Sequence, residues 1–449
     1  MFITVLNASP KGEYSITLQT VRYLEKLHPE HTFDVIHVGQ RIRALEKDLS
    51  PALDSLRKAE LILFSYPVYT FLAPYPLHRF FELVAESGIS LEGKYATQLS
   101  TSKHFYDVTA HRYVAENCAD FGLRYIRGLS ADMDDLLCER GQKDAEAFLD
   151  HTLWCMQNGI WESAPAAVPA YTPVMPTLPP SPAEKAKGES VIVTDCTEED
   201  TRLSAMIARL QAVSPVSTRV VNIRDFPFDG GCLGCFKCAV SGKCVYKDRF
   251  DDFLRENIQS ADAILIAFTV RQHSMGARFK LYDDRQFCNG HRAVTAGKPM
   301  GYLVSGNLSA EDNLRTLIEA RAQVGGNFLC GVATDERDPD GQIDDLAASL
   351  RYALDKGYTP PADFYGVGGT KIFRDLIWQM QGMMRADHKF YKAHGQYDFP
   401  QKKRGRMLAS YAIGALLSNP KILAKMGNKM NEGMIAPYKK LLDSMEKRP

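Results

Sequence analysis

Short apolar or β-branched runs alternate along the first 160 residues with segments whose apolar positions recur at helical spacing. Runs of this kind suit buried strands, and apolar residues three and four positions apart suit one face of a helix. The alternation of strand and helix predicts a parallel sheet with helices on both faces. We expect strands at 2–6, 33–38, 61–65, 95–100 and 125–129, and helices at 16–27, 52–59, 76–85, 108–121 and 143–156.

The same order returns in the second half of the chain. Seven prolines between positions 165 and 182 remove backbone donors and favour an extended connector between the two halves. The predicted domains are 1–160 and 189–358, joined by a linker at 161–188 and followed by an extension at 359–449. The second set comprises strands at 191–194, 219–223, 263–268, 300–305 and 328–333, and helices at 200–212, 250–259, 281–295, 311–322 and 346–354.

We therefore expect an α/β chain with two doubly wound, five-stranded parallel sheets, each in the order 2-1-3-4-5. The 54 basic and 54 acidic residues cancel, so no overall field attracts nucleic acid. No segment reaches the roughly 18 consecutive apolar residues of a membrane span. The N-terminus also lacks the features of an export signal, so we expect a cytoplasmic protein.

The C-terminal region differs in composition from both domains. Residues 360–449 are Met-rich and carry 16 Lys and Arg against 7 Asp and Glu. Two interpretations stay open: helices that pack over the domains with a solvated basic face, or a basic surface that docks on a membrane or on a partner.

A loop rich in hydroxyl groups follows the first predicted strand, between Ser9 and Thr17. Backbone N–H groups, hydroxyl donors and the positive end of a helix dipole converge in such a loop, which suits a phosphate. The alternative is plain helix capping by Ser and Thr. The third and fourth strands end in Pro67–Phe71 and Ser100–Tyr106, and these loops should meet the first at the switch point of the sheet. Together they predict a mononucleotide with a flat ring, unless the aromatic residues only cover the sheet end.

These motifs resemble the flavodoxin-like, NAD(P)H-dependent FMN reductases, through Ser9-Pro10-Lys11 and Pro67-Val68-Tyr69. The resemblance implies two tandem flavodoxin-like domains and FMN as cofactor. It implies that the FMN phosphate binds Ser9, Lys11, Ser15, Ile16 and Thr17. It implies that the isoalloxazine lies near Pro67, Val68, Tyr69, Thr70, Phe71, Ser100, Thr101, Ser102 and Tyr106.

Four cysteines fall within 13 positions of the second half, spaced C-x2-C-x2-C-x5-C: Cys232, Cys235, Cys238 and Cys244. One loop can wrap four such thiolates around a soft metal centre, and its glycines allow close backbone approach. We expect a [4Fe–4S] cluster. Zinc and four metal-free thiols are the alternatives, although zinc sites usually consist of two separated pairs.

The cysteine motif and the Lys247-Asp248 pair that follows it resemble the iron–sulfur flavoproteins. The resemblance extends to Ser274-Met275-Gly276 and covers roughly residues 1–355. In the second domain the first loop carries four carboxylates between Asp195 and Asp200, which repel an anion. We therefore expect one FMN, in the first domain, and one metal centre, in the second.

The leading hypothesis is an FMN-dependent oxidoreductase that passes electrons between NAD(P)H or ferredoxin and a small-molecule acceptor through an iron–sulfur centre. One alternative is an NAD(P)H:quinone or azo-compound reductase whose cysteines are structural. Another is a non-catalytic electron carrier or redox sensor. The resemblance also implies a homo-oligomer, for which the duplicated chain is a covalent substitute. His104, His273 and His291 are interpreted as structural residues.

Overall fold

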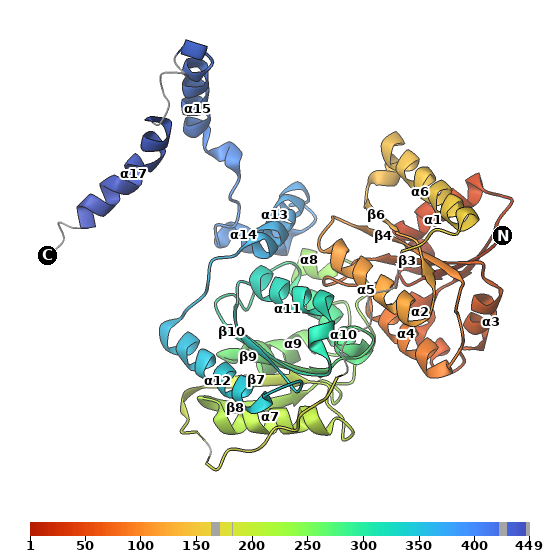
Figure 1. Ribbon diagram of the computed structural model, residues 1–449, viewed down its shortest axis with the longest axis horizontal. Helices are drawn as coiled ribbons and strands as arrows, with labels where there is room; N and C mark the ends of the chain where they lie inside the picture. Colours follow the sequence, from red (N-terminus) through yellow and green to blue (C-terminus); the bar gives the residue numbers. More distant parts are fainter. Residues whose placement is uncertain (163–170, 182, 422–428, 446–449) are drawn as a thin grey trace. The chain divides into compact units, whose positions relative to one another are not determined.

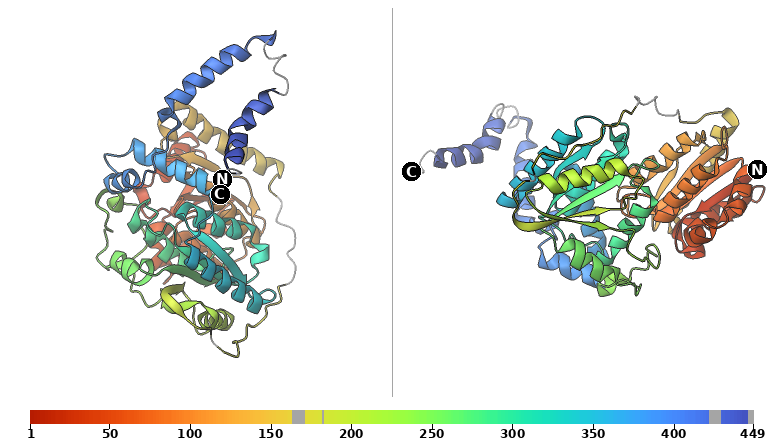
Figure 2. Two further views of the ribbon diagram at one scale, coloured as in Figure 1. Left: turned by 90° about the vertical axis from the view of Figure 1, so that its left-hand side faces the viewer. Right: turned by 90° about the horizontal axis from the view of Figure 1, so that it is seen from below.

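The computed structural model describes residues 1–162, 171–181, 183–421 and 429–445. The chain divides into two compact units, Met1–Tyr391 and Lys392–Pro449. The first unit contains both sheets, and helices lie on both faces of each (Figures 1 and 2).

The first sheet is parallel and has the predicted order, β2-β1-β3-β4-β5. Its strands are β1 (Phe2–Asn7), β2 (Thr32–Ile36), β3 (Leu61–Pro67), β4 (Tyr95–Ser102) and β5 (Arg124–Tyr125). Two short strands share the edge of the sheet next to β4. β5 pairs with the beginning of β4, and β6 (Leu129–Asp132) pairs with its end. Gly128 lies in the gap, where a Cβ atom would overlap the backbone of Gln98. This close approach separates β5 from β6.

The second sheet repeats the order as β8-β7-β9-β10-β11 and is also parallel. Its strands are β7 (Ala186–Thr194), β8 (Val216–Asn222), β9 (Ala263–Thr269), β10 (Pro299–Ser305) and β11 (Phe328–Thr334). Both five-stranded sheets predicted from the sequence are thereby confirmed. β7 begins five residues before the predicted strand, with polar residues that carry little apolar pattern.

Six helices belong to the first domain, one more than predicted. They are α1 (Ile16–Leu27), α2 (Val38–Leu45), α3 (Ser50–Lys58), α4 (Tyr75–Ser87), α5 (Asp107–Asp120) and α6 (Glu139–Asn158). Helix α2 was not predicted, because the second predicted strand extends to Val38. In the structure Val38, Ile42 and Leu45 are buried one helical turn apart on α2.

Six helices lie in the second domain: α7 (Thr201–Val213), α8 (Lys237–Ser241), α9 (Phe250–Leu254), α10 (Gly276–Arg285), α11 (Asp312–Gly325) and α12 (Pro339–Lys356). The predicted helix at 281–295 was wrong. α10 begins at Gly276 and ends at Arg285, and a 3-10 turn, Gln286–Asn289, follows it. Every residue of α10 except Arg278 is buried, including the charged ones. Its sequence therefore shows no alternation of an apolar and a polar face from which the helix could be predicted.

The two domains share one hydrophobic core, which contains Phe81 and Tyr113 of the first domain and Phe279 and Tyr282 of the second. Helices α4 and α10 pack against each other in this core. They also exchange equivalent hydrogen bonds. The Tyr75 backbone N–H donates to Asp284 Oδ2 over 2.7 Å, and the Ala277 N–H donates to Glu82 Oε1 over 2.7 Å.

The loops before α4 and α10 also have the same unusual backbone conformation. Thr70 and Phe71 have φ values of 43° and 73°, and Gln272 and His273 have values of 58° or less in the same left-handed region. Non-glycine residues rarely adopt this conformation, and two adjacent ones in each half make chance coincidence a poor explanation. The two domains therefore meet like the halves of a two-fold symmetric dimer.

The C-terminal region contributes helices to both units. In the first unit α13 (Phe364–Gln379) and the start of α14 (Arg385–Ala393) lie against the domains (Figure 1). The second unit contains α15 (Arg404–Leu417) and α17 (Lys429–Met445). No helix within the described parts of the chain is long and apolar enough to span a bilayer.

Candidate flavin and cysteine site

The loop after β1 gathers buried hydroxyl groups at the start of α1. Ser9, Ser15 and Thr17 are all buried. Ser15 is the N-cap of α1 and accepts a hydrogen bond from the Leu18 N–H over 3.4 Å. Thr17 Oγ1 lies 2.6 Å from Thr101 Oγ1, which joins this loop to the end of β4. The structure thus brings the predicted first and fourth loops together.

Lys11 supplies the cation of this loop. Its ammonium group has no hydrogen-bond or ion-pair partner among the residues that the structure describes, whereas the nearby Glu13 pairs with Arg22 and His37. An uncommitted lysine beside buried hydroxyls and a helix N-terminus fits a phosphate. Ile16, the first residue of α1, is partly exposed and offers its backbone there.

The loop after β3 is held in place by the second domain. Thr70 Oγ1 donates to Asp283 Oδ2 over 2.6 Å. Lys280 Nζ donates to the Tyr69 carbonyl over 2.9 Å, and Arg321 donates to the Thr70 carbonyl over 2.9 Å. All of these charged groups come from α10 and α11, so the predicted flavin loop depends on the second domain for its shape.

The buried charged side chains that hold this loop pair with one another. Burial opposes ionisation of Asp283, but Arg321 and Lys280 lower its pKa to about 2. Burial has the larger effect on the neighbouring Asp284, whose pKa is raised. Asp283 and Asp284 form a buried salt-bridge network with the two cations. The loss of one member of this network would leave another charge buried without a partner.

The loop after β4 uses several predicted side chains for internal contacts. Ser100 Oγ lies 2.7 Å from His111 Nε2, and Ser102 Oγ accepts from the His104 N–H over 2.8 Å. Tyr106 Oη donates to the Tyr365 carbonyl of α13 over 2.6 Å. The side chains of Ser100, Ser102 and Tyr106 therefore shape the loop.

The four clustered cysteines lie on one loop that contains the short helix α8. Gly234 and Gly242 adopt left-handed φ values of 60° and 78° within it. Among the described residues, three or more ligand atoms within 4.8 Å of one another occur at His28, Glu30 and His31 and at Glu116, His273 and Glu311, and not in this loop.

The donor set is four cysteine thiols on one loop, which is compatible with an iron–sulfur cluster and with a tetrahedral zinc ion.

The thiols of Cys232 and Cys238 are poorly solvated, whereas Cys235 is exposed. Burial raises the pKa of Cys238 to about 11, with further contributions from Asp387 and Cys235. Burial likewise raises the pKa of Cys232 well above its ordinary value. A bound cation reverses this preference, because it stabilises the thiolate form.

The cysteine loop lies directly on the predicted flavin loops. A Cβ atom at Gly234 would lie 3.0 Å from Tyr69 Cζ, closer still to its hydroxyl oxygen, and 3.3 Å from Lys11 Cε. One at Gly231 would lie 2.8 Å from Tyr75 Cδ1. Burial, followed by the nearby Cys232, raises the pKa of the Tyr69 hydroxyl. The two predicted sites are therefore neighbours within one chain.

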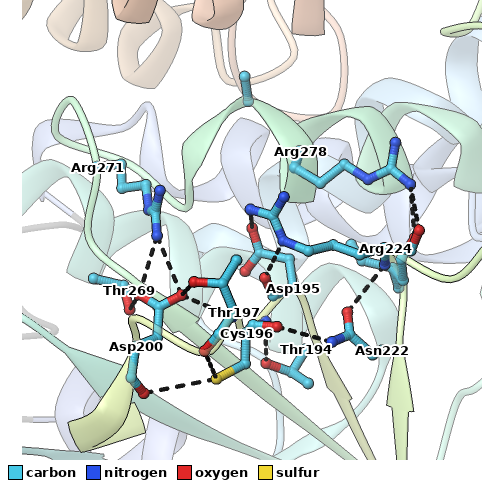
Figure 3. A network of polar contacts seen from close by, with 12 residues as sticks. Thr194, Asp195, Cys196, Thr197, Asp200, Asn222, Arg224, Thr269, Arg271 and Arg278 are labelled. Atoms are coloured by element: carbon cyan, nitrogen blue, oxygen red, sulfur yellow. Dashed lines mark hydrogen bonds and ion pairs between the residues drawn. The ribbon is translucent and has the colours of Figure 1, made fainter. Parts of the chain in front are cut away.

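The equivalent first loop of the second domain is filled by its own side chains (Figure 3). Asp200 Oδ2 accepts from the Thr197 N–H over 2.9 Å and from its hydroxyl over 2.7 Å. Asp200 Oδ1 accepts from Thr269 Oγ1 and from Arg271, over 2.9 and 3.0 Å. Burial raises the pKa of Asp195 to about 6, although Arg224 opposes this. A carboxylate thus takes the donors that a phosphate would need.

One residue near the cysteine loop belongs to no sequence motif and was not predicted. Cys288 is buried on the turn after α10, and burial, followed by Cys244, raises its pKa to about 12. Nothing in its spacing linked it to the cysteine motif. His104, His273 and His291 each pair with a carboxylate, so none of them is isolated.

The sheet order and the hydroxyl-lined loop at the switch point define a flavodoxin-like protein. Residues 1–131 match the family model described as "Flavodoxin-like fold", and residues 199–331 match the model described as "NADPH-dependent FMN reductase". With these matches in two tandem regions, the chain is a flavin-dependent oxidoreductase.

The chain is also similar to individual proteins. The chain is 25% identical over 175 residues to an iron-sulfur flavoprotein of Archaeoglobus fulgidus, an alignment that covers 36% of this chain and 78% of that protein. It is 31% identical over 121 residues to FMN-dependent NADH:quinone oxidoreductase 2 of Pseudomonas syringae pv. tomato, covering 20% and 58%. The solved NAD(P)H:quinone oxidoreductase from Methanothermobacter marburgensis is 14% identical, with coverage of 36% and 96% and a TM-score of 0.27.

Proposed function

We propose that the chain binds one FMN at the loops of its first domain and an iron–sulfur cluster on Cys232, Cys235, Cys238 and Cys244. It passes electrons between NAD(P)H or ferredoxin and a small acceptor such as a quinone. The observation that carries the proposal is the contact of Gly234, inside the cysteine motif, with Tyr69 and Lys11 of the flavin loops. FMN exchanges electrons in pairs or singly, whereas an iron–sulfur cluster exchanges them singly.

The protein residues have separable roles in this proposal. Lys11, the hydroxyl groups around it and the start of α1 bind the phosphate. Lys280 and Arg321 fix the carbonyl groups of the third loop, which orients the flavin ring. Asp200 excludes a second flavin phosphate from the other domain, even though the FMN reductase model matches that region. The expected stoichiometry is one FMN per chain.

The two-fold arrangement of the domains supports a covalent dimer, in which the cysteine loop of one half serves the flavin of the other. Its thiols need a reducing compartment, which agrees with the cytoplasm. The basic C-terminal region is the candidate for membrane-surface or partner contact, because α17 exposes Met434, Tyr438 and Leu441 beside Lys439 and Lys440.

The decisive experiment is anaerobic purification followed by measurement of the visible spectrum and of flavin, iron, sulfide and zinc. We expect one FMN, stoichiometric iron and sulfide, and bleaching of both chromophores by NAD(P)H or dithionite. Stoichiometric zinc without iron would favour a quinone or azo reductase with structural cysteines. Cofactors that are reduced without turnover of NAD(P)H and a quinone would favour an electron carrier.

A further inference from the structure

The turn between α1 and β2 carries two imidazoles and one carboxylate within four positions of the chain. Ligand atoms of His28, Glu30 and His31 all lie within 4.8 Å of one another. Because the turn precedes β2, it lies at the edge where the parallel strands begin, whereas the flavin loops follow the strand ends. The six residues of β1 separate these two edges by about 20 Å. The cluster is therefore distinct from the flavin and cysteine site.

The backbone holds the three side chains in a defined arrangement. The His31 N–H donates to the His28 carbonyl over 3.0 Å, which closes a four-residue turn. Pro29 takes the second position of this turn, where its fixed φ is favourable. The Thr32 N–H donates to the Met1 carbonyl over 2.9 Å and so joins the turn to the start of β1. The donor groups are thus arranged by the fold itself.

The distances within the cluster match the ligand spacing around a metal ion. Glu30 Oε1 lies 3.3 Å from His28 Nδ1 and 3.6 Å from His31 Nε2. Both separations are longer than the roughly 2.7–3.2 Å of an ordinary N–H···O hydrogen bond. Two ligands that each lie about 2.05 Å from a tetrahedral zinc ion are about 3.3–3.4 Å apart. The two imidazole rings are nearly parallel, with an interplanar angle of 11°.

The second cluster of ligand atoms, Glu116, His273 and Glu311, differs in this respect. Both nitrogens of His273 pair with carboxylates at hydrogen-bond length, 3.0 Å from Glu311 and 2.9 Å from Asp120. Burial opposes the charge, but these carboxylates raise the pKa of His273 to about 10. The ring is then an imidazolium at neutral pH and has no lone pair for a metal. This cluster is a salt-bridge network and serves as an internal control.

The groups of the turn are less committed to protein partners. The side chains of His28 and His31 are 18% and 16% exposed, and that of Glu30 is 58% exposed. Nδ1 of His31 is buried without a hydrogen-bond partner in the described parts of the chain, so no such bond fixes the position of the ring proton. A hydrogen bond from its own backbone, followed by the two histidines, lowers the pKa of Glu30, so its carboxylate is ionised at neutral pH.

We propose that this turn binds one Zn²⁺ ion through His28 Nδ1, Glu30 Oε1 and His31 Nε2. Imidazole nitrogen and carboxylate oxygen are established zinc ligands, and three protein ligands leave a fourth position for water. The ion would join the end of α1 to the start of β2. The site goes beyond the proposed function, because no step of the electron transfer passes through it.

The first test is calorimetric titration of zinc chloride into the full chain, purified anaerobically. The cysteine motif also binds zinc, so variants assign each binding event. Glu30→Gln and His31→Gln should each weaken one event at least about tenfold, since even outer partners of a metal ligand contribute that much. Cys235→Ala should keep this event.

Two matched controls accompany these variants. Glu25→Gln removes a carboxylate of the last turn of α1, which pairs with Arg22 over 2.8 Å. His273→Gln removes a histidine that has two carboxylate partners. Both should bind zinc as the wild type does.

The second test identifies the ligands, with Cys235→Ala as the background. Zinc X-ray absorption should show nitrogen and oxygen ligands at the turn. Zinc should also raise the thermal unfolding midpoint of this variant, because an ion that binds only the folded turn stabilises it. Adding Glu30→Gln should abolish that rise, and its exposed position keeps the fold intact.

The outcomes separate this inference from the proposed function. Wild-type zinc affinity in both Glu30→Gln and His31→Gln, or a zinc spectrum with sulfur ligands only, would overturn the site at the turn. FMN, iron and sulfide are measured on the same samples and should not change in Glu30→Gln. A wild-type protein without FMN or iron would overturn the proposed function and leave the zinc site standing.

Discussion

Replacing Gly234 with alanine tests whether the cysteine loop really rests on the flavin loops. Gly234 has a φ of 60°, which costs a residue with a side chain roughly 1–2 kcal/mol. The new methyl group would also collide with the buried Tyr69 ring, and overpacking of this kind costs about 1–3 kcal/mol. The expected loss is therefore about 2–5 kcal/mol of unfolding free energy.

Gly242→Ala is the control, since this glycine is in the same loop and has a similar φ of 78°. Its nearest neighbour, Arg292 NH1, would lie 3.4 Å from the Cβ atom, so only the backbone cost of about 1–2 kcal/mol applies. Removing the hydroxyl in a Gly234→Ala, Tyr69→Phe double variant should recover part of the difference.

Urea unfolding of the flavin-free, metal-free protein measures these differences. The same variants, loaded anaerobically, report how fast electrons pass between flavin and cluster. Gly234→Ala should slow this transfer more than Gly242→Ala does. Equal destabilisation by the two alanines, together with no recovery by Tyr69→Phe, would refute the contact between the loops.

The remaining predictions concern cofactors and pH. Lys11→Glu should weaken FMN binding at least tenfold, an order-of-magnitude estimate for reversing a charge beside a phosphate, whereas Asp195→Ala should not; fluorescence titration with FMN compares them, and equal losses would place the phosphate in the wrong domain. Cys235→Ala should abolish iron and sulfide while sparing FMN, and the exposed Cys138→Ala should alter neither; metal and flavin analysis decides this, and iron retained in Cys235→Ala would contradict the ligand set. Burial opposes the charge on His273, but two carboxylate partners raise its pKa to about 10. That contribution to stability is complete below about pH 6.5 and is lost as the pH rises toward 10, so unfolding free energy should fall more steeply above pH 7 in the wild type than in His273→Gln; parallel curves would contradict the assignment.

The sequence predicted both sheets because apolar runs buried on two sides leave a direct signal. It failed where burial is uniform or irregular. Helix α10 is buried all round and offered no amphipathic period, so its predicted bounds were displaced by several residues. Helix α2 was absorbed into the preceding strand, because Val38 fits either element.

The candidate site likewise has a part that the sequence predicted and a part that it did not. The hydroxyl loop and the cysteine motif are local in sequence, and their spacing indicated ligands without a structure. The contact between Gly234 and Tyr69, the clamp of Lys280 on the third loop and the pairing of His291 with Asp387 join residues more than ninety positions apart. One sequence alone does not reveal such pairs, because they depend on how the domains and the C-terminal helices pack.

The reciprocal hydrogen bonds of α4 and α10 have an evolutionary consequence. In a homodimer built from one gene, every substitution appears on both sides of the axis, so a carboxylate that blocks one anion loop blocks its twin as well. Joining the halves in a single chain removes this constraint. Asp200 closes one loop while Lys11 stays available in the other, and the cysteine motif occurs on one side only. The fused chain keeps the geometry of a symmetric pair while each half can specialise independently.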